Sequence, residues 1–95
     1  MNQEQREFIR SLSREERLLV RVRDVIYEGD WSEVERDLQA RLSGGPYILT
    51  LASRIEDDLK RIERLKEFEA KNGVDAGVLL DLLGAEEGTG SKHET

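Results

Sequence analysis

Apolar residues between Pro46 and Asn72 recur at intervals of three and four, the spacing that places side chains on one face of an α-helix. Helix-breaking residues lie only outside this segment, with Gly44 and Gly45 before it and Gly73 after it. The pattern predicts one uninterrupted helix over 46–72, roughly 40 Å long. Its apolar positions are Ile48, Leu51, Ile55, Leu59, Ile62, Leu65 and Phe68.

Two shorter apolar segments precede the long one. Ser13 and Glu16 have the spacing of a capping box, and the apolar residues that follow at helical spacing predict a helix over 14–28 with an apolar face. The residues of this face are Leu18, Leu19, Val22, Val25 and Ile26. A continuous helix from Gln3 would place Glu15 in the middle of the apolar face, so we expect a break near 11–13. Upstream of the break, a short helical turn is predicted by Phe8, Ile9 and Leu12.

Two further helices are predicted by their capping residues. Asp30 and Glu33 form a second capping-box pattern before a helix over 31–43, in which Trp31 joins the apolar face. Asp75 is placed to cap a short last helix that ends at Gly84.

These elements predict an all-α protein, because no segment shows the alternation of a β-strand. We expect residues 1–84 to form a single helical domain and 85–95, which carry no large apolar side chain, to form a disordered tail. The turn between the helices at 14–28 and 31–43 is too short for anything except an antiparallel hairpin. The predicted fold is therefore a small helical bundle with a short antiparallel helical hairpin, one long helix and a short C-terminal helix.

The long helix has more apolar surface than such short neighbours can cover, and exposed apolar surface of this size usually marks an interface. We expect a homodimer, or assembly with another protein, through a coiled-coil-like stripe. The alternative is that the N-terminal turn and a bent long helix close the core within one chain. The last helix either docks in a groove of a partner or folds back on the long helix. The expected interface comprises Ile55, Leu59, Ile62, Leu65, Phe68, Leu79, Leu82 and Leu83.

The composition of the chain is typical of a small intracellular domain without disulfides. A chain of 95 residues without cysteine has a thin core and no disulfide to reinforce it. The N-terminus lacks the apolar run of a signal peptide, and no apolar cluster approaches the length of a membrane span. We therefore expect a cytoplasmic protein that contacts no membrane.

The residues that could carry chemistry do not form a recognisable site. Glu56, Asp57 and Asp58 are consecutive on a helix, so their side chains point about 100° apart and cannot converge on one metal ion. The single histidine, His93, lies in the predicted tail, and no serine lies near an ordered base. We expect no enzyme, no metal, no cofactor and no small-molecule substrate.

Every basic residue in the first half of the chain is an arginine, and four of them follow helical spacing: Arg10, Arg14, Arg17 and Arg21. They are expected to form one stripe opposite the apolar face, able to bind phosphates or carboxylates. The simpler interpretation is a solvated face with weak ion pairs. A net charge of −6 opposes binding to nucleic acid. The primary hypothesis is a non-enzymatic protein-interaction or scaffolding module, and the alternative is a nucleic-acid-associated regulator that uses this stripe. A third possibility, an acidic decoy for a basic protein surface, depends on the net charge alone.

Overall fold

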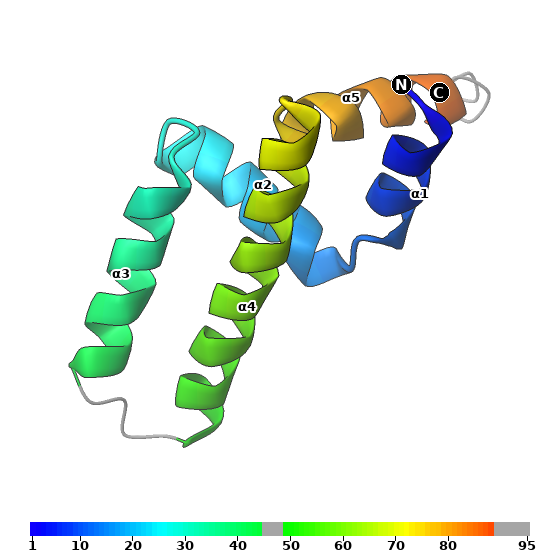
Figure 1. Ribbon diagram of the computed structural model, residues 1–95. Helices are drawn as coiled ribbons and strands as arrows, with labels where there is room; N and C mark the ends of the chain where they lie inside the picture. The colour runs from blue at the N-terminus through cyan, green and yellow to red at the C-terminus, as the bar shows by residue number, and fades with distance from the viewer. Residues whose placement is uncertain (45–48, 89–95) are drawn as a thin grey trace.

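The computed structural model describes residues 1–44 and 49–88, and all regular structure in these ranges is helical (Figure 1). The all-α class predicted from the sequence is confirmed. The helices are α1 (Gln3–Ser11), α2 (Arg14–Ile26), α3 (Trp31–Ser43), α4 (Leu49–Asn72) and α5 (Ala76–Gly88).

Side-chain caps determine where α1 and α2 begin. Asn2 accepts a hydrogen bond from the Gln5 backbone N–H, and Ser13 accepts one from Glu16, each within a complete capping box. Between the two helices Leu12 has an extended backbone, so the predicted break is confirmed.

The turn from α2 to α3 depends on left-handed backbone conformations. Glu28 and Gly29 have φ angles of 55° and 83°, and the Gly29 N–H bonds the Arg23 carbonyl at 3.0 Å, closing the end of α2. Asp30 then caps α3 through the Ser32 N–H at 2.9 Å. Glu33 forms an ion pair with Arg36 instead of completing the predicted capping box.

The two C-terminal helices differ from their predicted bounds in different ways. α4 is described from Leu49, so its predicted start at Pro46 lies outside the described residues. α5 continues to Gly88, and the predicted end at Gly84 is wrong. A glycine inside a helix costs only about 1 kcal/mol relative to alanine, and an ion pair between Arg6 and Glu86 attaches the last turn of α5 to α1. The remainder of the predicted tail, 89–95, is outside the described residues.

α4 is the central element of the fold. It packs against α3 on one side and is crossed by α2, while α1 and α5 pack together beside its C-terminal half (Figure 1). The antiparallel hairpin is therefore formed by α3 and α4, and not by the helices at 14–28 and 31–43 as expected. Those two helices both pack mainly on α4, because the left-handed turn at Glu28 and Gly29 directs α3 along α4.

All five helices contribute to one core. Phe8 of α1 stacks on Phe68 of α4 with ring centroids 3.8 Å apart, so the N-terminal helix helps to cover the long one. The buried apolar side chains of this core are Ile9, Leu12, Val20, Trp31, Val34, Ile62, Leu65, Phe68, Ala76, Leu79 and Leu83. Over residues 1–44 and 49–88, no helix has both the length and the apolar character that a membrane crossing needs.

Candidate functional site

The predicted contact stripe of the long helix lies inside the chain. Ile62 and Leu65 are completely buried, and Ile55, Phe68, Leu79 and Leu83 are nearly so. Leu59 is half-buried, and only Leu82 is exposed. These buried side chains do not form an exposed stripe, because α2, α3 and α5 pack on α4 and Phe8 of α1 stacks on Phe68.

The orientation of α2 is the largest departure from the sequence pattern. Leu18, Val25 and Ile26, which the pattern placed toward the core, are 62%, 79% and 65% exposed. The charged residues Glu16 and Arg23 are buried instead, on either side of Val20. Burying a charge is costly unless it is paired, so the partners of these two residues explain the orientation.

Arg23 is 1% exposed and connects α2 with α4 and the start of α5. Its guanidinium donates hydrogen bonds to both carboxylate oxygens of Glu69 at 2.7 and 2.8 Å and to Asp24 at 2.9 Å, and it also pairs with Asp75. The guanidinium carbon lies 4.4 Å from the ring centroid of Trp31. Burial alone lowers the pKa of Arg23, but the bonds to Glu69 and Asp24 outweigh it and raise the pKa above its ordinary value.

Glu69 is equally well satisfied. Beyond Arg23, its carboxylate accepts hydrogen bonds from Trp31 Nε1 and from the Ala76 backbone N–H, both at 2.7 Å. We call Arg23, Asp24, Glu69 and Asp75 the Arg23 network. It joins α2, α4 and the beginning of α5, and Trp31 of α3 is attached to it through Glu69. The network therefore determines which side of α2 faces inward.

The second buried charge of α2 is held in a similar way. Glu16 accepts from the Ser13 backbone N–H at 2.9 Å and pairs with Arg64 of α4, which also bonds Ser11 at 2.8 Å. Burial raises the pKa of Glu16, but the hydrogen bonds from Ser13 and Arg64 lower it more, and the net pKa is below its ordinary value. Arg64 in turn lies 4.5 Å from the ring centroid of Phe8.

These buried charges all have partners within the fold. Within the described ranges, no buried side-chain nitrogen or oxygen lacks a hydrogen-bond partner, and no three potential metal ligands converge.

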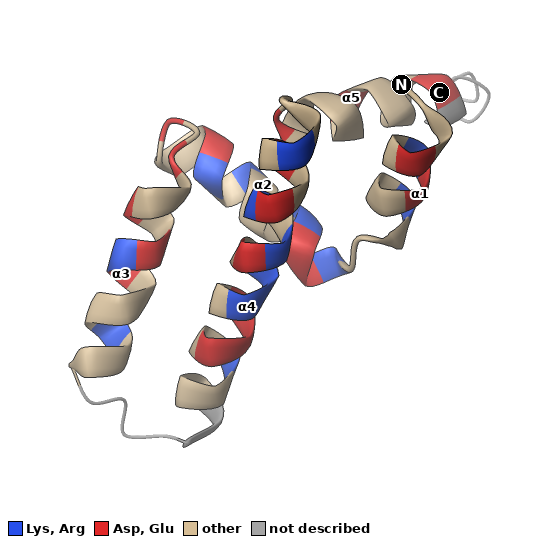
Figure 2. Cartoon of the chain, viewed as in Figure 1, with Lys and Arg blue, Asp and Glu red and all other residues tan. Residues whose placement is uncertain are grey.

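The exposed side of α2 adjoins an exposed apolar side of α5. Arg21 and Asp81 connect the two helices by an ion pair of 2.8 Å. Leu18 and Val25 lie one turn from Arg21 on α2. Val78 lies one turn before Asp81 on α5 and one turn before Leu82, and these two apolar side chains are 50% and 49% exposed. We define Leu18, Val25, Val78 and Leu82 as the α2–α5 apolar face. Figure 2 shows that most of α5 carries no charge, whereas α4 carries both signs along its length.

The arginine stripe is interrupted in the structure. Arg10 belongs to α1 and lies across the break from the other three, and Arg21 is paired with Asp81. Arg14 is exposed on the same side of α2 as Leu18, and Arg17 is exposed beside it, so the stripe adjoins the exposed apolar residues and does not lie opposite them. Helical spacing already placed Arg14, Leu18, Arg21 and Val25 on one side, and this signal was available in the sequence.

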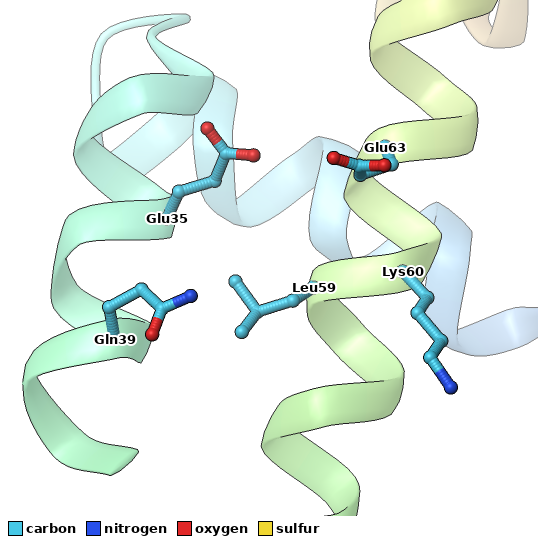
Figure 3. Close-up of a pocket in the computed structure, with 5 residues that line it drawn as sticks. All are labelled: Glu35, Gln39, Leu59, Lys60 and Glu63. Carbon is cyan, nitrogen blue, oxygen red and sulfur yellow. The ribbon is translucent and has the colours of Figure 1, made fainter. Parts of the chain in front are cut away.

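A groove of about 390 Å³ separates α3 from α4 (Figure 3). Leu59 points from α4 toward α3, and Glu35 and Glu63 extend toward each other above it, while Lys60 points away. Glu35 is held by an ion pair with Lys66 at 3.1 Å. The groove thus presents one apolar side chain within a polar rim, and Gln39 completes its lining.

Comparison of the chain with protein-family models, with curated proteins and with solved structures finds no match.

Proposed function

We propose that this chain is a non-enzymatic protein-interaction module that binds a protein on the α2–α5 apolar face. The observation that supports this proposal is the orientation of α2, in which Arg23 is buried while Leu18 and Val25 remain mostly exposed. Isolated exposed apolar residues are common on protein surfaces. Here they are large, follow helical spacing, and adjoin a second exposed apolar pair on α5.

Covering these side chains would supply binding energy. Complete burial of a leucine or valine side chain is worth about 1.5–3 kcal/mol relative to full exposure. Arg14 and Arg17 border the face and would add polar contacts at its rim, where charges influence association rate and specificity. A second protein surface with an apolar centre and acidic margin fits this arrangement.

Site-specific photo-crosslinking in cells tests the proposal. A photoreactive residue replaces Arg14, one turn from Leu18, and in a matched control it replaces Arg36, which is exposed on α3. We expect a discrete crosslinked protein from position 14 and none from position 36. Adding Leu18→Asp and Val25→Asp should abolish the product. Because both side chains are exposed, this variant should keep its melting temperature within a few degrees.

Equal crosslinking from positions 14 and 36, or a product that survives both aspartate substitutions, would remove the α2–α5 apolar face from consideration. Crosslinks to nucleic acid that disappear in an Arg14→Glu/Arg17→Glu variant would instead favour the nucleic-acid-associated alternative, whose binding would also weaken steeply with salt.

A further inference from the structure

The exposed charges of α2 are unequally distributed along its length. Arg14, Glu15 and Arg17 lie near the N-terminal end, which therefore has a net positive charge, and Glu28 and Asp30 follow the C-terminal end; all five are exposed. The apolar residues Leu18 and Val25 lie between the two ends. Arg21, which lies between these two residues, is paired with Asp81 of α5. The outer surface of α2 therefore changes from net basic, through apolar residues and this ion pair, to acidic.

We propose that the protein bound on this surface is a second copy of the chain, with the two α2 helices packed antiparallel about a two-fold axis. This inference rests on the proposed function and specifies its partner. Leu18 of each copy faces Val25 of the other, and residues 21 and 22 lie beside the axis, where Arg21 of each copy is paired with Asp81 of its own chain. A two-fold contact uses the same patch on both copies, and this patch is self-complementary when reversed.

Charge complementarity selects the antiparallel direction. A parallel pair would place Arg14 beside Arg14 and align the two helix dipoles, and both effects are repulsive. In the antiparallel pair Arg14 of one copy lies near Glu28 of the other, and this contact occurs twice. A single crossing of two helices buries few side chains, so the dimer is weak, with dissociation in the micromolar range.

A charge-reversal experiment tests the pairing. By sedimentation equilibrium of the full chain, Arg14→Glu alone and Glu28→Arg alone should each weaken self-association about tenfold, because each homodimer then contains two like-charge contacts. An equimolar mixture of the two variants should associate at least as strongly as the wild type, since in the mixed dimer both contacts between positions 14 and 28 are again between opposite charges. Arg36→Glu, on the exposed side of α3, is the matched control and should leave association unchanged.

The absence of native cysteine allows a second, geometric test. In the antiparallel pair the two Leu18 residues are roughly 10 Å apart along the helix axis, beyond the reach of a disulfide. Leu18→Cys alone and Val25→Cys alone should therefore form little crosslink on oxidation, while a mixture of the two should form the mixed disulfide. Efficient crosslinking of Leu18→Cys with itself would indicate a parallel pair and overturn the proposal.

The outcomes separate this inference from the proposed function. A chain that stays monomeric at millimolar concentration, but still crosslinks to another protein from position 14 in an aspartate-sensitive manner, overturns the self-pairing and supports the docking face. A monomer without any such crosslink overturns both.

Discussion

The Arg23 network makes a strong prediction, because Arg23→Met removes its only buried cation and leaves the carboxylate of Glu69, itself largely buried, without a counter-charge. Breaking a buried ion pair by removing one partner typically costs about 3–5 kcal/mol of unfolding free energy. Glu69 keeps its hydrogen bonds from Trp31 and Ala76, so we expect the lower end, about 3 kcal/mol. For a domain of this size, that loss lowers the melting temperature by roughly 15 °C.

Urea denaturation followed by circular dichroism and by Trp31 fluorescence measures this loss. Trp31 is a direct reporter because it lies against the Arg23 guanidinium and donates to Glu69. With a slope of about 1.5 kcal/mol per molar urea, the midpoint should fall by roughly 2 M. Arg36→Met, which breaks an exposed pair with Glu33, should change the unfolding free energy by less than about 0.5 kcal/mol.

A double-mutant cycle separates the ion pair from simple loss of packing. Adding Glu69→Gln to Arg23→Met removes the stranded charge and should recover about 1–2 kcal/mol, although one acceptor for Trp31 or Ala76 is lost. An Arg23→Met chain as stable as the Arg36→Met control, or a double variant no better than the single one, would refute the reasoning.

Three further predictions concern other contacts of the fold. The folded-state pKa of Glu16 lies below the ordinary value of 4.5, so the contribution of Glu16 to stability is complete above pH 4.5 and is lost on further acidification. When the pH is lowered, the melting temperature of Glu16→Gln should therefore fall less steeply than that of the wild type. Gly77→Ala places a methyl group against Asp24 and Asp75, whose carboxylates are held by Arg23, and should lower the unfolding free energy in urea by about 1–3 kcal/mol. Gly84→Ala, with open space around it, should stabilise α5 by about 0.5–1 kcal/mol, and equal effects of the two substitutions would contradict this prediction. Phe8→Ala removes the ring stacked on Phe68 and should cost about 2 kcal/mol in the same assay, with a heat capacity change showing whether α1 has detached; an unchanged midpoint would mean that α1 does not contribute to the core.

Local signals in the sequence predicted the helices well, because the residues that form a cap lie within one turn of each other. The capping box at Ser13 and the N-cap at Asp30 correctly placed the starts of α2 and α3. The end of α5 was not predicted, since the ion pair between Arg6 and Glu86 joins residues at opposite ends of the chain. No pattern within a single segment reports such a contact.

The packing faces were harder to predict than the helices. Apolar periodicity correctly placed Ile62, Leu65 and Phe68 on one side of α4 but could not say whether this chain or another covers them. The elements that cover α4 lie on both sides of it in the chain: α2, α3 and α5 pack on it, and α1 contributes Phe8, which stacks on a residue sixty positions away.

The orientation of α2 shows why periodicity failed at the candidate site itself. An interpretation based on hydrophobic spacing assigns the more apolar side of a helix to the core and every charged side chain to solvent. This assignment is correct for a charged group that has no partner, because burying it is costly. Arg23 can be buried only because Glu69 and Asp75 approach it from other elements, and Glu16 only because Arg64 does. Once these ion pairs hold one side of α2 inward, Leu18 and Val25 must face outward, on the opposite side of the same helix. The buried charges and the exposed apolar residues are thus one feature of the fold, so a substitution that releases Arg23 should disturb binding on the α2–α5 apolar face even though Arg23 does not reach that face.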